Sequence, residues 1–337
     1  MLQALPPVFA GLDPDDVAVA ASLLQSLALT AGDVIMEQGE EDTTLAFITT
    51  GAASVQVGDV RIGGAGARDV LGLAELFTGI PRVATVVASG PVQLTVLAPE
   101  AWMELCEAGN PAVYNIERAA IRRLGERLRW FNQGIAERSR GEELKLHPSR
   151  GLFARISKSL RGKAAPDVDA ATVLQQSSLF SWADGTVLQQ IGESFTAERF
   201  EAEHILCRQD EAADRMWIVA EGHVDIVLLT GPDRAEKLGS VGPGEAFGDA
   251  TMAMGTSRTA SCVSHQEGIA LVLERDKYLE LFAVDDQAGS VFRQGMVRNL
   301  VRQMLAAQKR FIELADVDAD QQEAMIHGTP ISTVWRD

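Results

Sequence analysis

One pattern occurs twice in the sequence, and this repetition limits the possible folds more than any other feature. A shift of 171 residues superimposes the early part of the pattern on its second copy, and a shift of 176 residues superimposes the later part. The matched residues include the pairs Phe9/Phe180, Gln38/Gln209, Gly51/Gly222, Gly72/Gly248, Arg82/Arg258 and Leu105/Leu281. The shift changes in the polar stretch 230–237, which is typical of a longer hairpin loop. The sequence therefore predicts two copies of one domain.

Each copy is predicted to be mainly β. Its apolar runs are short and lie between glycine and polar turns, as at 44–48, 53–57, 216–219 and 224–228. Runs of this length and spacing are typical of a sandwich or barrel. Because the two copies share the pattern, we expect the same β architecture in both.

A helix with an apolar stripe is predicted at the end of each copy. In the first copy the stripe repeats every four residues along the helix 115–136, and a similar stripe ends the second copy. The stripe residues are Ile116, Ala120, Leu124 and Leu128 in the first copy and Phe292, Met296, Leu300 and Met304 in the second. Such stripes usually pack into a core, and they are also compatible with a homodimer seam.

Charge is distributed unevenly along the chain. The 337 residues carry a formal net charge of −17, yet the segment 117–163 holds 13 Lys/Arg against 5 Asp/Glu, a net of +8. A basic band between two acidic blocks is what a linker between domains would give. We therefore predict a first domain at 1–136, a basic linker at 137–171, a second domain at 172–315 and an acidic C-terminal tail at 316–337.

Several classes of protein are excluded by the sequence. The longest uncharged stretch, 83–98, is too short for a membrane-spanning helix, which needs about 20 apolar residues. The N-terminus lacks the basic start of a signal peptide. Three cysteines are too few and too scattered for a disulfide framework or a paired zinc motif. We therefore expect a cytoplasmic protein.

The basic linker is the one segment whose charge suits an anionic partner. Residues 150–163 have the pattern of a short basic amphipathic helix, which suits a membrane surface, a partner's groove or a plain connector that packs on one domain. The two acidic domains would repel nucleic acid, and no recognition helix fits after residue 315. DNA binding is therefore not expected.

A glycine-rich turn in the second copy has the residues that a phosphorylated sugar needs. Gly248 allows backbone N–H groups to turn toward an anion, and Arg258 can place its guanidinium on two phosphate oxygens. Asp249, nine residues before Arg258, can accept hydrogen bonds from sugar hydroxyls. Taken alone, an acid and an arginine in a turn are more often a surface ion pair.

The order of these residues resembles the cyclic nucleotide-binding domain family. The resemblance rests on Phe247-Gly248-Asp249 followed by Ser257-Arg258-Thr259-Ala260-Ser261, and on Leu71-Gly72-Leu73 followed by Pro81-Arg82-Val83-Ala84-Thr85. It covers roughly residues 5–135 and 172–310. The tandem arrangement resembles the regulatory subunit of cyclic-AMP-dependent protein kinase, and one copy resembles the sensor domain of catabolite-activator proteins.

The resemblance implies two jelly-roll-like β-rolls flanked by helices, and it implies roles for particular residues. In the family, these motifs form a phosphate-binding cassette. Its arginine holds the cyclic phosphate, and its acidic residue holds the ribose 2′-hydroxyl. These roles would fall to Arg258 and Asp249 in the second copy and to Arg82 in the first. The remaining implied contacts, from backbone groups or hydroxyls, are Gly248, Ala250, Thr259 and Ser261 in the second copy and Gly72, Ala74 and Thr85 in the first.

The first copy departs from the family pattern at the acid. Leu73 stands nine residues before Arg82, and leucine accepts no hydrogen bond. Glu75 lies only seven residues before Arg82 and would need a shifted turn to take this role. We therefore expect the first copy to be ligand-free or specific for another ligand.

The second copy keeps the acidic charge, although Asp249 is one methylene shorter than the glutamate of the family. Asp210 stands where the first copy has Gly39, in a turn that often requires a positive φ. Asp tolerates that conformation better than most residues, so the turn is expected to survive. The second copy is therefore the better candidate for a ligand.

An enzyme is not indicated. His204-x-x-Cys207 and Cys262-x-x-His265 resemble metal-ligand pairs, but residues three apart on a strand point to opposite faces. The sequence has no phosphate loop of the Gly-x-x-x-x-Gly-Lys kind and no Ser/His/Asp order. We therefore predict no catalytic residue, no metal and no cofactor.

Two functions remain open at this point. The first is a non-catalytic regulatory protein that binds cyclic AMP or cyclic GMP in its second copy and relays binding to an unidentified protein partner. The alternative is a structural or adaptor protein whose two degenerate copies bind no nucleotide. Such a protein would act through protein–protein or membrane-surface contacts.

Overall fold

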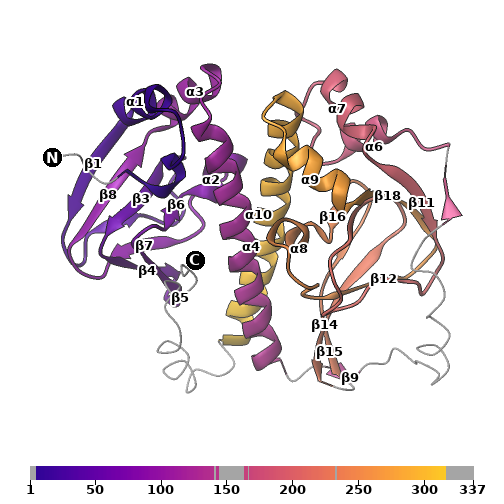
Figure 1. Cartoon of the computed structure of the whole chain (residues 1–337). Coiled ribbons are helices and arrows are strands. Elements are labelled where there is room, and N and C mark those ends of the chain that lie inside the picture. Colours follow the sequence, from indigo (N-terminus) through magenta and orange to yellow (C-terminus); the bar gives the residue numbers. More distant parts are fainter. Residues whose placement is uncertain (1–4, 140–141, 144–162, 166, 232–233, 316–337) are drawn as a thin grey trace. The chain divides into compact units, whose positions relative to one another are not determined.

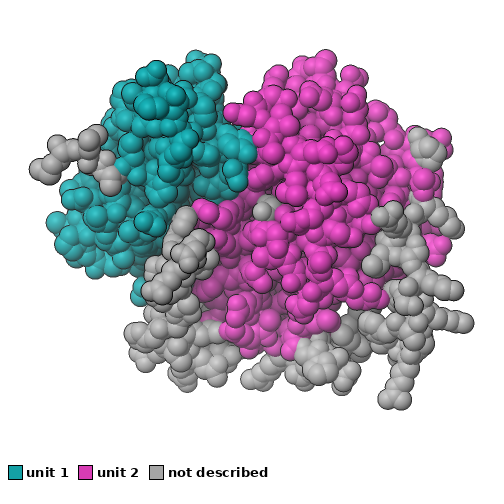
Figure 2. Space-filling view, viewed as in Figure 1, with its two compact units in different colours: residues 1–120, 318–337 teal, residues 121–317 magenta. Residues whose placement is uncertain are grey.

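The structure is a computed structural model, and it describes most of the chain (Figure 1). The described residues are 5–139, 142–143, 163–165, 167–231 and 234–315. By their contacts they divide into two compact units, 1–120 and 121–317, with 318–337 assigned to the first (Figure 2). The predicted amphipathic helix 150–163, except Lys163, and the predicted tail 316–337, lie outside the described residues.

Unit 1 contains two antiparallel sheets between short helices. Its elements are η1 (Pro7–Phe9), α1 (Pro14–Ser22), β1 (Leu24–Leu29), β2 (Val34–Met36), β3 (Leu45–Thr50), β4 (Ala52–Val57), β5 (Val60–Gly66), β6 (Val70–Leu71), α2 (Leu73–Thr78), β7 (Thr85–Ala88), β8 (Val92–Leu97) and α3 (Pro99–Glu107), followed by α4 (Ala112–Arg138), which continues into unit 2. Among the described residues the strand orders are β1-β8-β3-β6 and β2-β7-β4-β5.

Unit 2 repeats this arrangement with one additional strand in each sheet. Its elements are β9 (Glu142–Glu143), β10 (Lys163–Ala164), α6 (Ala170–Gln176), α7 (Gly185–Gly192), β11 (Thr196–Phe200), β12 (Ile205–Cys207), β13 (Arg215–Glu221), β14 (Val224–Gly231), β15 (Arg234–Val241), β16 (Ala246–Phe247), α8 (Asp249–Met254), β17 (Ser261–Ser264), β18 (Gly268–Glu274), α9 (Arg275–Ala283) and α10 (Gln287–Ala315). Where the chain is described, the orders are β10-β11-β18-β13-β16 and β12-β17-β14-β15-β9.

The two sheet pairs correspond strand by strand. Removal of the edge strands β9 and β10 leaves the order of unit 1, with β11 in place of β1 and β12 in place of β2. The prediction of two β-rolls with flanking helices is confirmed. The extra residues near 230 lengthen the hairpin β14–β15, whose strands each have eight residues, compared with six and seven in β4 and β5.

Each roll buries the apolar faces of its two sheets against one another. In unit 1 the core includes Ile48, Val86 and Leu94, all at most 5% exposed. In unit 2 the rings of Trp217 and Phe247 stack within the core, with centroids 5.0 Å apart and planes 8° apart. Stacked aromatic rings of this size contribute packing beyond their buried area.

In unit 2 the C-terminal part of α4 packs against α10. The ring of Phe311 lies 5.0 Å from that of Trp130 and 5.4 Å from that of Phe131, measured between centroids. Gly134 lies in the same contact, where the absence of a side chain lets the Phe311 ring approach the helix backbone. No helix in the described part of the chain is long and apolar enough to span a membrane.

Gly134→Ala tests whether this helix contact holds unit 2 together. On an exposed helix the change would stabilise by about 1 kcal/mol. Here the new Cβ would lie 2.5 Å from Cε2 of Phe311. We therefore expect the opposite sign, a loss of about 1–3 kcal/mol in the free energy of unfolding. Urea denaturation followed by tryptophan fluorescence measures it, with the exposed neighbour Gln133→Ala as control. A stabilised Gly134→Ala variant would contradict the contact.

Candidate functional site

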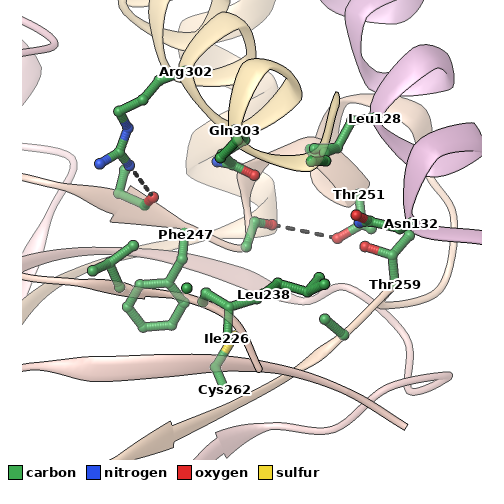
Figure 3. A pocket seen from close by; sticks show the side chains of 18 of the residues that line it. Leu128, Asn132, Ile226, Leu238, Phe247, Thr251, Thr259, Cys262, Arg302 and Gln303 are labelled. Atoms are coloured by element: carbon green, nitrogen blue, oxygen red, sulfur yellow. Dashed lines mark hydrogen bonds between the residues drawn. The ribbon is translucent and has the colours of Figure 1, made fainter. Parts of the chain in front are cut away.

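The second β-roll holds a cavity of about 330 Å³, within the size range of small-molecule sites. Its walls come from the β14–β15 hairpin, the turn before α8, the start of β17 and the two helices α4 and α10 (Figure 3). Figure 3 shows Leu128 of α4 and Gln303 of α10 on one side and Ile226 and Leu238 of the hairpin on the other. All of the residues that line the cavity belong to unit 2, so the cavity lies within one compact unit.

The turn before α8 requires glycine. Gly248 has a φ of +81°, and a Cβ on it would lie 2.9 Å from Nη1 of Arg258 and 3.0 Å from the ring of Trp217. A side chain is therefore excluded both by backbone conformation and by the close approach of Arg258. Gly72, its counterpart in the first repeat, has a φ of +86°, and its Cβ would lie 2.6 Å from Nη1 of Arg82.

Arg258 lines the cavity and is only 3% exposed. Its Nη1 donates to the carbonyl oxygen of Gly248 at 2.8 Å, and its Nη2 donates to the carbonyl oxygen of Arg215 at 2.5 Å. The guanidinium carbon lies 5.1 Å from the centroid of the Trp217 ring. Within the described residues its buried Nε has no hydrogen-bond partner. The Nε of Arg82 also lacks a partner among the described residues, so this donor is available in the second repeat but does not by itself distinguish the two arginines.

The charge of Arg258 is only weakly compensated. In the described part of the chain Arg258 forms an ion pair with one carboxylate, that of Asp214, whose side chain is 63% exposed and whose Oδ1 lies 3.4 Å from Nη2. Thr251 stands next to Nη1 at 3.4 Å and offers a neutral hydroxyl. An exposed carboxylate is well solvated and binds a cation weakly, so the cavity wall keeps a positive potential.

Arg82 has the same backbone setting but a different electrostatic one. It is 2% exposed, forms an ion pair with Asp42 and donates to the carbonyl oxygen of Thr44 at 2.8 Å. Glu75, 5% exposed, lies 3.6 Å from its Nη1. Although burial alone would raise the pKa of Asp42, hydrogen bonds from Thr44 and Arg82 lower it, so this carboxylate is charged at neutral pH. Arg82 is thus compensated by two carboxylates of its own chain.

The difference between the two arginines comes from one position of the repeat. Glu75 and Thr251 each stand three residues after the turn glycine, at Gly72 and Gly248 respectively. The first repeat places a carboxylate beside its arginine there, and the second places a hydroxyl. A bound phosphate would be repelled by the former and accepted by the latter.

Asp249 is not among the residues that line the cavity. Its side chain is buried, 1% exposed, and its Oδ1 accepts a hydrogen bond from Nε2 of Gln303 in α10 at 3.0 Å. Burial raises the pKa of Asp249, while hydrogen bonds from Asn299 and Gln303 partly oppose this. Asp249 thus lies between the cavity-lining residues Gly248 and Ala250 without lining the cavity itself, and its role at a ribose hydroxyl stays a prediction.

The other predicted residues lie in three different settings. Gly248, Ala250 and Thr259 line the cavity with Arg258. The hydroxyls of Ser261 and Thr85 instead accept hydrogen bonds from the backbone N–H groups of Gln209 and Gln38, at 3.0 and 3.1 Å. Both hydroxyls thus fix a strand to the preceding turn. In the first repeat Gly72 and Ala74 form the start of α2 next to Arg82.

Several cavity residues were missed by sequence reasoning because they come from distant helices. Arg302, Gln303 and Arg310 reach the cavity from α10, and Asn132 reaches it from α4. Asn132 is 6% exposed, and in the described structure its Oδ1 has no hydrogen-bond partner. A signal was present, since Asn132 is the next i+4 position after Leu128 on the apolar stripe of α4. A polar residue on such a stripe indicates a specific contact.

The comparison with protein-family models identifies both repeats. The cyclic nucleotide-binding domain model matches residues 27–108 and 197–285, which together are half of the chain. The chain belongs to the cyclic nucleotide-binding domain family. The matches cover β1 to the end of α3 in the first repeat and β11 to α9 in the second. Both arginine turns described above therefore lie inside the family's domain.

Several solved structures are similar to this chain at low sequence identity. One is the regulatory domain of Toxoplasma gondii PKA with cAMP, at 17% identity and a TM-score of 0.32, covering 82% of this chain and 87% of that one. Another is the regulatory subunit of a cAMP-independent protein kinase A from Trypanosoma brucei, at 18% identity and a TM-score of 0.30, covering 80% of this chain and 80% of that one. A third is a cyclic nucleotide-binding domain from Methylobacillus flagellatus, at 20% identity and a TM-score of 0.36, covering 45% of this chain and 82% of that one. The search of curated proteins found no match.

Asp249→Asn tests the buried carboxylate in this family member. Because the folded-state pKa is raised, the folded protein holds a proton that the unfolded chain loses above its ordinary value of 3.8. Stability from this group therefore falls as pH rises through the folded pKa. Asn cannot ionise, so we expect the variant to be more stable at pH 7, by on the order of 1 kcal/mol, and the gain to shrink toward pH 4.

Urea unfolding at the two pH values measures the effect. The exposed Asp285→Asn serves as control and should give no comparable gain. A destabilised Asp249→Asn variant at pH 7, with the same deficit at pH 4, would show that the carboxylate is not held under an ionisation penalty.

Proposed function

We propose that the chain is a non-catalytic cytoplasmic regulatory protein that binds a cyclic nucleotide, cyclic AMP or cyclic GMP, in its second repeat and relays binding to a protein partner. The observation that carries the proposal is Arg258. It is a buried guanidinium in a cavity wall, with an unpartnered Nε and the neutral Thr251 beside it. Membership of the cyclic nucleotide-binding domain family supplies the ligand class.

The phosphate would occupy the cavity next to Arg258. A cyclic phosphate carries one negative charge and needs donors that water does not already satisfy. The buried Nε supplies such a donor, and the guanidinium charge strengthens the bond. Thr259, which also lines the cavity, offers a hydroxyl to the same anion. The weak link to the exposed Asp214 would be lost at little cost.

The base would occupy the apolar part of the cavity. Leu128, Ile226 and Leu238 line this part, and Asn132 lines the same cavity with an unpartnered buried amide oxygen. An amide offers one acceptor and adjacent donors, which suits the polar edge of a base. Burial of an unpaired amide is unfavourable, so a ligand that pairs with Asn132 gains affinity.

Relay of binding would run through the helices that line the cavity. Arg302 of α10 forms an ion pair with Glu245, and Arg310 donates to Glu236 at 2.8 Å. A ligand anion near these residues changes the balance of both pairs and thereby the favoured position of α10. Such a ligand shifts the conformational equilibrium only by its difference in affinity between the two states. The partner is not identified by the chain.

The first repeat supports the adaptor alternative for its own half of the chain. Asp42 and Glu75 already form ion pairs with Arg82, and a phosphate would have to displace a buried carboxylate. Breaking a buried ion pair costs about 3–5 kcal/mol. We therefore propose that the first repeat binds no cyclic nucleotide and acts as a scaffold.

Isothermal titration calorimetry of the full chain with cyclic AMP and cyclic GMP tests the proposal. We expect one site per chain, and a loss of about 10- to 100-fold in affinity for Arg258→Gln, the range of one or two charge-assisted hydrogen bonds. The matched variant Arg82→Gln with Glu75→Gln removes the ion pair of the first repeat and should leave the affinity unchanged. If neither nucleotide binds, the adaptor alternative is favoured for both repeats.

Exchange of the deciding residue between the repeats gives a sharper control. Thr251→Glu would place the carboxylate of the first repeat beside Arg258, and Thr251→Val would remove the hydroxyl without adding charge. We expect the first variant to abolish binding and the second to keep it within a fewfold. Equal affinities for the two variants would show that charge at this position does not decide binding.

Asn132→Leu tests the base contact. Loss of a hydrogen bond to a buried partner weakens binding of cyclic AMP by about tenfold. A cyclic purine riboside monophosphate, whose base lacks the exocyclic amino group, should bind the wild type and the variant more nearly alike. Calorimetry with both ligands measures the difference. Equal weakening for the two ligands, or none for either, would place Asn132 away from the base.

A further inference from the structure

Two buried cysteines face one another across the sheet beneath Arg258. Cys207 ends β12 and Cys262 lies in β17, and the two are direct cross-strand partners. Each is 4% exposed to solvent, yet both line the cavity (Figure 3 labels Cys262). The Cys262 thiol is close enough to lower the pKa of Cys207. A small molecule that enters the cavity therefore meets two adjacent sulfurs.

The position of this pair suits a disulfide. Directly opposed residues of antiparallel strands have Cα atoms about 4.5–5.5 Å apart, and disulfides join Cα atoms about 4.4–6.8 Å apart. The register of β12 shifts by one residue between Ile205 and Cys207. This bulge places Cys207 opposite Cys262.

The first repeat has the same bulge with inert residues. Met36 of β2 pairs with Val86 of β7 after an equivalent register shift. Both are buried core residues, at 7% and 5% exposed. The fold therefore needs two apolar side chains here and does not need two thiols. The second repeat carries a reactive pair at a place where packing alone is satisfied by Met and Val.

The third cysteine, Cys106, differs from this pair in the direction in which the pKa of its thiol is shifted. Burial of its sulfur and the charges of Glu117 and Glu107 raise the pKa of Cys106 to about 11. The hydrogen bond from Cys262, and after it the charge of Arg258, lower the pKa of Cys207 despite its burial. Because the thiolate is the nucleophile, this direction of the pKa favours Cys207 as the attacking sulfur, although Cys106 is the exposed cysteine.

We propose that Cys207 and Cys262 are a redox-modification site, which a hydroperoxide converts into a reversible disulfide in the cavity wall. The Cys207 thiolate attacks one oxygen of hydrogen peroxide, the O–O bond breaks, and hydroxide leaves and takes up a proton as water. The Cys262 sulfur then attacks the sulfenic sulfur of Cys207, the S–O bond breaks, and a second water leaves with the thiol proton. Two thiols are oxidised and one peroxide is reduced.

Arg258 connects this site to the ligand. Its charge stabilises the Cys207 thiolate, and under the proposed function it also holds the cyclic phosphate. Thiolate and phosphate therefore compete for one cation, so a bound nucleotide slows oxidation. This connection rests on the proposed function, whereas the disulfide does not.

Intact mass spectrometry of the full chain, treated with hydrogen peroxide and then denatured and alkylated, tests the disulfide. The wild type should lose the mass of two hydrogen atoms and keep one alkylatable thiol, and dithiothreitol should restore all three. Cys106→Ser should behave likewise with no thiol left. Cys207→Met with Cys262→Val, the pair found in the first repeat, should lose no hydrogen.

Two results would overturn the disulfide proposal. One is that the wild type keeps three thiols at peroxide concentrations that fully oxidise a free low-pKa thiol. The other is that the oxidised product contains Cys106 or accumulates as sulfinic acid on Cys207. Saturating cyclic AMP should slow the reaction at least fivefold. Unchanged oxidation in its presence, with the disulfide still formed, would count against the proposed nucleotide site and leave the dithiol site standing.

Discussion

A buried guanidinium beneath a glycine turn is the constraint on which each repeat depends. An arginine that is almost fully removed from water must have its donors satisfied. In the second repeat the carbonyl oxygens of Gly248 and Arg215 satisfy Nη1 and Nη2 and leave only Nε unpartnered among the described residues, and only a glycine at 248 lets the turn come close enough. The strand order brings these groups together, because β13 pairs with both β16 and β18. The turn, the sheet and the arginine therefore specify one another.

The same frame gives two electrostatic outcomes. Glu75 and Asp42 neutralise Arg82 from within the first repeat, whereas Thr251 leaves Arg258 with an exposed carboxylate alone. Duplication of a domain preserves the backbone positions, and one side chain then decides whether the arginine serves the fold or a ligand. The cysteine pair shows the same freedom, since it occupies the place of an apolar pair without altering the bulge.

The fold was predictable from sequence because its signals are local and occur twice. Glycines, short apolar runs and the arginine turn repeat at two fixed shifts, and even the positive φ expected at Asp210 is found, at +68° against +87° for Gly39. The site was only partly predictable. The direction of the Asp249 side chain depends on Gln303, 54 residues away, and the wall near Asn132 depends on how α4 packs in unit 2. Such contacts follow from packing, and the one local signal, a polar Asn132 on the apolar stripe of α4, does not say what it contacts.

The groups that α10 brings to the cavity are already engaged, and this determines how a ligand could act. Arg302 is paired with Glu245, Gln303 with Asp249, and Arg310 with Glu236. A ligand that took over one of these bonds would replace a partner on the β-roll, whereas the buried Nε of Arg302 has no hydrogen-bond partner among the described residues. Under the proposed function, each replacement would weaken one contact between α10 and the β-roll, and the favoured position of α10 would then differ between the empty and the occupied cavity. Because Asp249 sits at the start of α8, next to the turn that presents Arg258, release of Gln303 would affect both walls of the cavity together.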